Sequence, residues 1–208
     1  MKKKKKKKTA LLALVIMIWA GAIAGGLKAL GDYANMSGKV GKRLGAWPSA
    51  SALKRPLDHK PILVLFLHPK CPCSRATVGQ LDALMAQTNR KAHVYAMFVQ
   101  PKGWTENETK GPLWSKAAEI PGVIPILDPE GREAKHFGAL TSGHLLAFDG
   151  EGGLGFSGGI TISRGHMGDN PGLTAAIQFV NSGGAPIQQS KVFGCSLFKT
   201  HEKVALRR

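Results

Sequence analysis

The residues best suited to chemistry are two cysteines that flank a proline, in the run Cys71-Pro72-Cys73-Ser74. An apolar run, 61–67, precedes this motif, and a stretch with helical spacing, 75–85, follows it. We therefore predict that a buried strand ends near His68 and that a helix begins near Ser74. The first N–H groups of a helix lack backbone partners and lie at the positive end of its dipole. This position stabilises a thiolate and predicts a reactive cysteine.

Thiol–disulfide exchange is the first chemistry that this motif suggests. Exchange needs a thiolate that attacks and a second thiol that resolves the mixed disulfide. Cys71 fits the attacking role, because Lys70 and the start of the helix both favour its thiolate. The resolving thiol is Cys73, whose disulfide with Cys71 would close a small and strained ring, or Cys195, or an external thiol. Ser74 supports the site by hydrogen-bonding the thiolate or by capping the helix.

The N-terminus has the composition of a membrane anchor. Residues 2–8 are all lysine, and residues 9–27 carry no charge, which is long enough for a helix to cross a bilayer. The lysines predict a cytoplasmic N-terminus, and hence a single-pass protein of the plasma (inner) membrane with a periplasmic, extracytoplasmic domain. The alternative is a signal peptide cleaved near residues 20–22. Under both interpretations the cysteines face an oxidising compartment.

Composition narrows the remaining function classes. The 208 residues carry a net charge of +16, but beyond the lysine run the basic residues are scattered singly, so we expect no nucleic-acid partner. Three cysteines form an odd set, and two of them are too close in sequence to hold a fold together by a disulfide. Redox or metal chemistry is the better use for them.

The rest of the chain alternates between helical and strand patterns. Expected strands are 62–67, 92–99, 123–127, 145–148 and 154–156, and expected helices are 74–87, 112–120, 132–137 and 171–180, the last capped by Asp169 or Asn170. This order predicts an α/β fold with a mixed sheet flanked by helices. The expected divisions are a cytoplasmic lysine segment 1–8, a transmembrane segment 9–27, a linker 28–58, a domain 59–181 and a tail 182–208 that contains Cys195.

The element order resembles the thioredoxin fold over residues 59–181. The chain is similar to membrane-anchored, exported thioredoxin-like proteins of the TlpA and ResA kind, through Phe66 before Cys71 and through the turns 126–131 and 146–152. The Cys-Pro-Cys-Ser motif, with segments 156–161 and 164–170, is similar to the RedB-type subgroup. The resemblance implies an extracytoplasmic thiol–disulfide oxidoreductase without a cofactor, acting on protein or small-molecule thiols and disulfides.

The sequence departs from that family at two positions. Ser74 stands where the family has its second cysteine, and Gly143 stands where it has a cis-proline that faces the nucleophile. The resemblance therefore implies that Gly143 and its neighbour Ser142 support the site. Because of these two departures, the chain is not expected to exchange disulfides through the family's usual pair of cysteines.

A soft-metal site is the alternative interpretation of the same cysteines. Two thiolates and an imidazole suit Cu(I) or Zn, and the ligand set would be Cys71, Cys73 and His144, with Cys195 as a fourth ligand. His144 is preferred over His68 and His166 because the resemblance implies that Gly143 faces the cysteines. The chain would then be a copper-binding or copper-chaperone protein without turnover. A non-catalytic, membrane-tethered adaptor is the third class.

Overall fold

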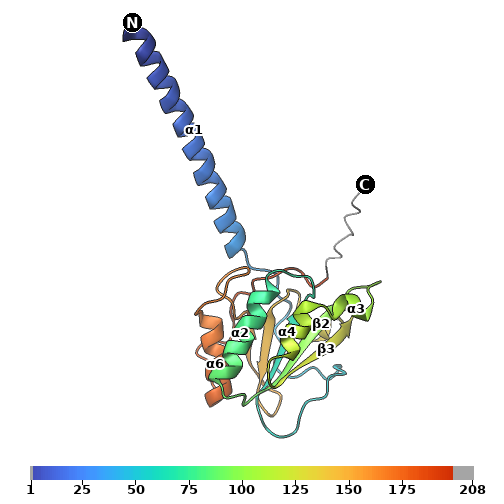
Figure 1. The fold of residues 1–208 in the computed structure, drawn as a ribbon. Helices are drawn as coiled ribbons and strands as arrows, with labels where there is room; N and C mark the ends of the chain where they lie inside the picture. The colour runs from blue at the N-terminus through green and yellow to red at the C-terminus, as the bar shows by residue number, and fades with distance from the viewer. Residues whose placement is uncertain (1, 199–208) are drawn as a thin grey trace. The chain divides into compact units, whose positions relative to one another are not determined.

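The computed structural model of the chain describes residues 2–198, which separate into two units that meet between Met36 and Ser37 (Figure 1). The first unit is a single helix, α1 (Lys2–Asn35). Its segment Ala10–Asn35 contains an 18-residue window with a mean hydropathy of 2.3 and is long and apolar enough to cross a membrane, by length and composition. The helix continues past Leu27, where we expected a linker, because residues 28–35 contain no proline and include an ion pair between Lys28 and Asp32, one helical turn apart.

The second unit is built on a five-stranded mixed sheet in the order β3-β2-β1-β4-β5. The strands are β1 (Ile62–Leu67), β2 (His93–Gln100), β3 (Val123–Pro129), β4 (His144–Phe148) and β5 (Leu154–Gly158). Strands β1, β2 and β3 run parallel, and β4 runs antiparallel to both β1 and β5. The helices are α2 (Ser74–Gln87), α3 (Glu106–Thr109), α4 (Pro112–Ala118), α5 (Arg132–His136) and α6 (Pro171–Ser182).

The two faces of the sheet bury different layers. Leu63, Leu65 and Leu67 of β1 pack with apolar residues of α2, α4 and α6, the three helices that cover one face in Figure 1. The alternate residues of β1 belong to a second apolar cluster, which includes Ala134 of α5 and Phe137. Because successive side chains of a strand point to opposite faces, β1 is buried on both sides, and this explains its uninterrupted apolar sequence.

Residues 37–58 pack on the domain. Trp47 contacts the rings of Phe137 and Phe148 at centroid distances of 5.1 Å each. Leu44 and Leu53 pack against the same cluster. We expected these residues to act as a spacer, but their apolar side chains complete the second layer of the core.

Most element positions agree with the sequence patterns, and the mixed α/β fold is confirmed. The bounds of β1 and α2 are those predicted. Asn170 is the N-cap of α6, since its Oδ1 accepts a hydrogen bond of 2.9 Å from the Leu173 N–H. Helix α3 was not predicted, although Thr105 and Glu108 form a capping box at its start and so carried a sequence signal for it.

The length and composition of α1 predict stable membrane anchoring. We expect alkaline carbonate to leave the full chain in the membrane fraction, with residues 1–35 still attached in N-terminal sequencing. The physical reason is the burial of an uninterrupted apolar helix in the bilayer. A chain that washes into the soluble fraction and begins near Ile23 would contradict the anchor and support the cleaved signal peptide.

Candidate active site

The thiol motif lies at the junction of β1 and α2. The Cys71 N–H donates to the His68 carbonyl oxygen at 3.1 Å, and the Ser74 N–H donates to the Cys71 carbonyl oxygen at 3.1 Å, so a tight turn leads into the helix. Cys73 is the N-cap residue of α2 and makes no side-chain capping bond. Cys71 is buried, with 3% of its surface exposed. The strand-to-helix position expected for Cys71 is therefore observed.

Hydrogen bonds hold Cys71 in its thiolate form. The thiol of Cys195 and the hydroxyl of Ser74 donate to its sulfur, as do the backbone N–H groups of both residues, and they lower the Cys71 pKa to about 4 despite the opposing effect of burial. We expected Lys70 to stabilise the Cys71 thiolate, but its Nζ lies over Trp104, 4.2 Å from the ring centroid. The donors of Cys195 and Ser74, rather than Lys70, account for the thiolate.

Three sulfur atoms meet at this point. The Sγ atoms of Cys71, Cys73 and Cys195 all lie within 4.8 Å of one another. The hydrogen bond that Cys195 donates to Cys71, together with burial, raises the pKa of the Cys195 thiol. Burial and the nearby Cys71 anion raise the pKa of Cys73, and a hydrogen bond from Arg164 opposes that rise. At neutral pH the cluster therefore holds one thiolate and two protonated thiols.

Ser142 ties the segments of the site together. Its Oγ accepts a hydrogen bond of 2.7 Å from the His68 N–H and lies 2.7 Å from the Ser74 Oγ. Its backbone N–H donates to the Cys195 carbonyl oxygen at 2.8 Å. One buried residue thus joins the end of β1, the start of α2 and the tail. This is a structural basis for the supporting role that we expected of Ser142.

Gly143 fixes the loop that carries Ser142. Its N–H donates to the Phe66 carbonyl oxygen at 2.7 Å, and its φ of +92° lies in the region that favours glycine. A Cβ at this position would lie 3.0 Å from the Thr77 Oγ1 on α2. A side chain here would be strained in its backbone and would press on the helix that supports Cys71.

The tail places Cys195 by docking along the loop before β4. Thr141 forms an antiparallel bridge with Ser196, and the Leu197 N–H donates to the Leu140 carbonyl oxygen at 3.0 Å. A Cβ on Gly194 would overlap the carbonyl oxygen of Ser142, so only glycine fits between the tail and this loop. The tail is thus docked on the domain through its residues up to Phe198.

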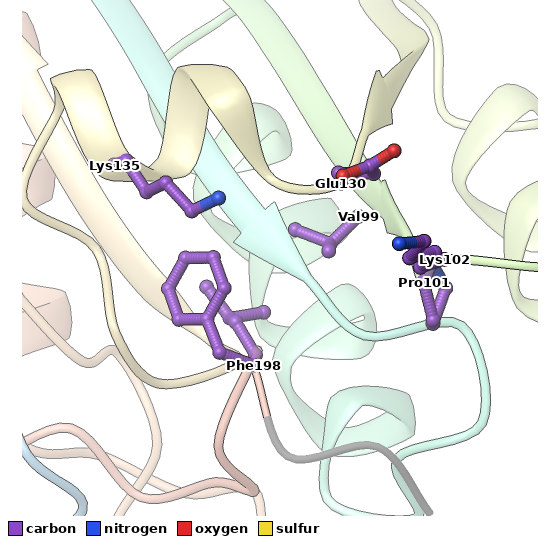
Figure 2. Close-up of a pocket in the computed structure, with 7 residues that line it drawn as sticks. Val99, Pro101, Lys102, Glu130, Lys135 and Phe198 are labelled. Atoms are coloured by element: carbon purple, nitrogen blue, oxygen red, sulfur yellow. The ribbon is translucent and has the colours of Figure 1, made fainter.

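The end of the described tail packs against the second apolar cluster, which contains Leu197 and is contacted by Phe198. Leu197 is 2% exposed, and the Lys135 Nζ lies 5.4 Å from the ring centroid of Phe198. These two tail residues form one wall of a surface pocket of about 320 Å³, whose opposite wall includes Lys102 and Glu130 (Figure 2). The aromatic contact and the buried leucine anchor the tail beyond Cys195.

His144 does not join the cysteines as the metal hypothesis required. It pairs with Phe66 in the β1–β4 register, and both side chains therefore point to the face of the sheet opposite α2. Its Nε2 lies 2.8 Å from the Ser157 Oγ, and among the described residues its Nδ1 has no hydrogen-bond partner. Burial lowers the His144 pKa to about 4, so the ring is neutral. The ligand set of Cys71, Cys73 and His144 is therefore not assembled.

The two weaker histidine candidates have other partners. His68 is buried, and its Nδ1 accepts a hydrogen bond of 3.3 Å from the Lys70 N–H. The His166 Nδ1 lies 2.8 Å from the Arg164 carbonyl oxygen within its own loop. Arg164 is the site residue that the sequence analysis missed. Its only sequence signal was the polar, glycine-rich character of the segment 164–170.

The hydrogen bonds to Cys71 predict a thiolate that persists in acid. With a pKa of about 4, Cys71 stays ionised as the pH falls to about that value and becomes protonated below it, whereas a free cysteine at pH 6 is about 0.3% ionised. We expect Ser74→Ala to raise the midpoint by about one pH unit, since one hydrogen bond to a charged group is lost. Thiolate absorbance and the pH profile of iodoacetamide labelling at Cys71, followed by mass spectrometry, measure this midpoint.

Ser182→Ala, at the end of α6, is the matched control for that experiment and leaves the midpoint unchanged. The midpoint is the observable rather than the absolute rate, because Cys71 is 3% exposed. A wild-type midpoint near that of a free thiol would contradict the assignment of Cys71 as the thiolate.

The close contact at Gly194 predicts that tail docking is sensitive to a single methyl group. Gly194→Ala would push the tail away from Ser142, and we expect faster hydrogen exchange at the amides of Ser142 and Leu197, whose bonds hold the tail. Gly184→Ala is the control, because a Cβ there meets nothing within 4 Å. Equal exchange in both variants would mean that the tail is not held by this contact.

Comparison with known proteins is consistent with the fold. No family model and no curated protein matches the chain. An uncharacterized conserved protein from Geobacillus kaustophilus is 18% identical, with a TM-score of 0.57 over 81% of this chain and 96% of its own. A hypothetical protein from Sinorhizobium meliloti is 21% identical, with a TM-score of 0.58 over 81% of this chain and 99% of its own. A secreted disulfide oxidoreductase from Mycobacterium tuberculosis is 16% identical, with a TM-score of 0.38 over 47% of this chain and 68% of its own.

The likeness to the proteins from Geobacillus kaustophilus and Sinorhizobium meliloti concerns the fold alone. The topology of the chain itself identifies the fold. Parallel strands β1, β2 and β3 lie beside an antiparallel β4–β5 hairpin, helices flank the sheet, and the cysteine motif lies between β1 and α2. The domain that carries the three thiols has the thioredoxin-like fold.

Proposed function

We propose that the chain is a membrane-anchored, extracytoplasmic thiol–disulfide oxidoreductase in which Cys71 attacks and Cys195 resolves. The observation that carries this proposal is the contact between the two residues, in which the Cys195 thiol donates a hydrogen bond to the Cys71 thiolate. Exchange requires a stabilised thiolate and a second thiol within reach, and this pair supplies both. The apolar helix α1 supports the membrane location, and its lysine-rich start supports a cytoplasmic N-terminus.

The exchange proceeds in two displacements. The Cys71 thiolate attacks one sulfur of a substrate disulfide, which forms a mixed disulfide and releases the first substrate sulfur as a thiolate. Cys195 then loses its proton and attacks the Cys71 sulfur, which releases the second substrate thiolate and leaves a Cys71–Cys195 disulfide. The substrate gains two electrons and the protein loses two. An external dithiol reduces the protein again by the reverse displacements.

Hydrogen bonding prepares each partner for its step. The hydroxyl and the backbone N–H of Ser74, at the start of α2, and the thiol and backbone N–H of Cys195 favour the thiolate of Cys71 before attack. Once Cys71 is consumed in the mixed disulfide, its negative charge no longer raises the pKa of Cys195, so deprotonation of the second thiol becomes easier at the moment when it must attack. Protein or small-molecule thiols and disulfides are the proposed substrates.

The roles of the cysteines predict distinct outcomes in variants. We expect Cys71→Ser to reduce turnover of a disulfide substrate to the uncatalysed rate, because no thiolate remains to attack. We expect Cys195→Ser to accumulate a mixed disulfide at Cys71, because the resolving thiol is missing. Reduction of a model disulfide and mass-spectrometric identification of the linked peptides measure both effects.

Cys73→Ser is the matched comparison, because it removes a thiol of the same cluster. Under oxidation this variant still forms the Cys71–Cys195 disulfide. Unchanged turnover in Cys71→Ser would refute the proposal, and a mixed disulfide that accumulates in Cys73→Ser rather than in Cys195→Ser would transfer the resolving role to Cys73.

A further inference from the structure

Disulfide exchange leaves one sulfur of the cluster without a role. The proposed cycle uses Cys71 and Cys195, yet the Sγ of Cys73 also lies within 4.8 Å of both. The three residues come from two separate segments, since Cys71 and Cys73 precede α2 and Cys195 belongs to the tail. The tail is held in place by Ser142 and by its bridge to Thr141. The third thiol is therefore part of a defined arrangement.

The spacing of the sulfurs is close to that of a metal-thiolate site. A metal–sulfur bond of about 2.3 Å separates neighbouring sulfurs by about 3.8 Å in tetrahedral geometry and by about 4.0 Å in trigonal geometry. The Sγ atoms of Cys71, Cys73 and Cys195 all lie within 4.8 Å of one another, so no separation is more than about 1 Å longer than these values. The three sulfurs are therefore close enough together to bind one ion.

We propose that Cys71, Cys73 and Cys195 form a three-sulfur binding site for one Cu(I) ion, which the tail completes. This ligand set replaces the one expected from the sequence, in which His144 took the place of Cys195. The site goes beyond the proposed exchange activity, because it binds an ion to the reduced thiols and transfers no electron.

The nature of the ligands favours Cu(I) over Zn²⁺. Thiolates select soft ions, and both Cu(I) and Zn²⁺ accept them. Structural Zn²⁺ is almost always held by four ligands. Within residues 2–198, the metal-capable group that contains Cys71 offers three sulfurs and no imidazole or carboxylate. Three sulfurs complete a trigonal Cu(I) site, whereas Zn²⁺ would have an open position.

Charge and protonation are consistent with this ion. Cys71 is already a thiolate, and its charge raises the pKa of Cys73 and contributes to the raised pKa of Cys195. A bound cation removes this repulsion, so the remaining thiols release their two protons to solvent on binding. Arg164, which is hydrogen-bonded to Cys73, offsets part of the negative charge that the three thiolates retain around Cu(I).

Metal binding and exchange exclude each other in this arrangement. A Cys71–Cys195 disulfide removes two of the three ligands, so only the fully reduced protein holds the ion. Conversely, coordination to Cu(I) withdraws charge from the Cys71 sulfur and lowers its nucleophilicity toward a disulfide. The copper content of the site therefore depends on the redox state of the protein.

The test is an anaerobic titration of the reduced full chain in detergent with Cu(I), in competition with bicinchoninate. We expect one Cu(I) per chain. Loss of a group that only orients a metal ligand costs 10–100-fold in affinity, so Cys71→Ser, Cys73→Ser and Cys195→Ser should each weaken binding by at least about 100-fold. His166→Gln, an exposed imidazole in the Arg164 loop, is the matched control and leaves the affinity unchanged.

X-ray absorption of the copper-loaded chain supplies the second measurement. We expect three sulfur neighbours and no imidazole nitrogen. Wild-type affinity in Cys195→Ser, a nitrogen ligand in the spectrum, or wild-type binding no tighter than that of Cys71→Ser would each overturn the site. Loss of Cys195 could also release the tail. Cys73→Ser removes a ligand that lies outside the tail, so its weaker Cu(I) binding tests the site independently of tail docking. If the protein reduces disulfides but does not bind Cu(I), the copper site is wrong and the proposed exchange activity stands. If it binds Cu(I) but does not exchange disulfides, the proposed function is wrong and the copper site stands.

Discussion

The site depends on one electrostatic requirement, which is that a nearly buried sulfur must carry a negative charge. Removing an anion from water is costly unless hydrogen-bond donors replace the water. For Cys71 those donors come from Ser74 at the start of α2 and from Cys195 in the tail. Each of these two segments must be held against the end of β1 for its donors to reach the Cys71 sulfur. The buried hydroxyl of Ser142 provides that connection, with one hydrogen bond to the end of β1 and a contact with Ser74.

The glycines around this point follow from the same requirement. The tail approaches the loop before β4 at Gly194 more closely than a side chain would permit, and Gly143 leaves room for the Thr77 hydroxyl of α2. Gly143 also adopts a positive φ, which turns the chain so that its N–H reaches Phe66 while Ser142 faces His68. Glycine at these positions buries no side chain, but it allows the tail to lie close to the thiols.

The sequence predicts the local part of this arrangement well. Strand β1 and helix α2 are recognisable because an uninterrupted apolar run and a helical spacing meet at the cysteine motif, and the position of Cys71 follows directly. The sequence does not reveal that His144 points away from the cysteines, because strand parity depends on the residue at which β4 begins, and that is set by the pairing of His144 with Phe66. The contact of Arg164 with Cys73 joins residues far apart in the sequence, and no local pattern encodes it.

The position of Cys195 in the tail has a consequence for biosynthesis. Chains are made from the N-terminus, and domains begin to fold in that order. The sheet strands, α2 and α6 all precede Cys195 in the chain, so the core is synthesised before the last sulfur arrives. During that interval Cys71 and Cys73 are present without Cys195. Newly made chains therefore pass through a period in which these two thiols can pair with each other or with thiols of other molecules, before the tail brings Cys195 beside them.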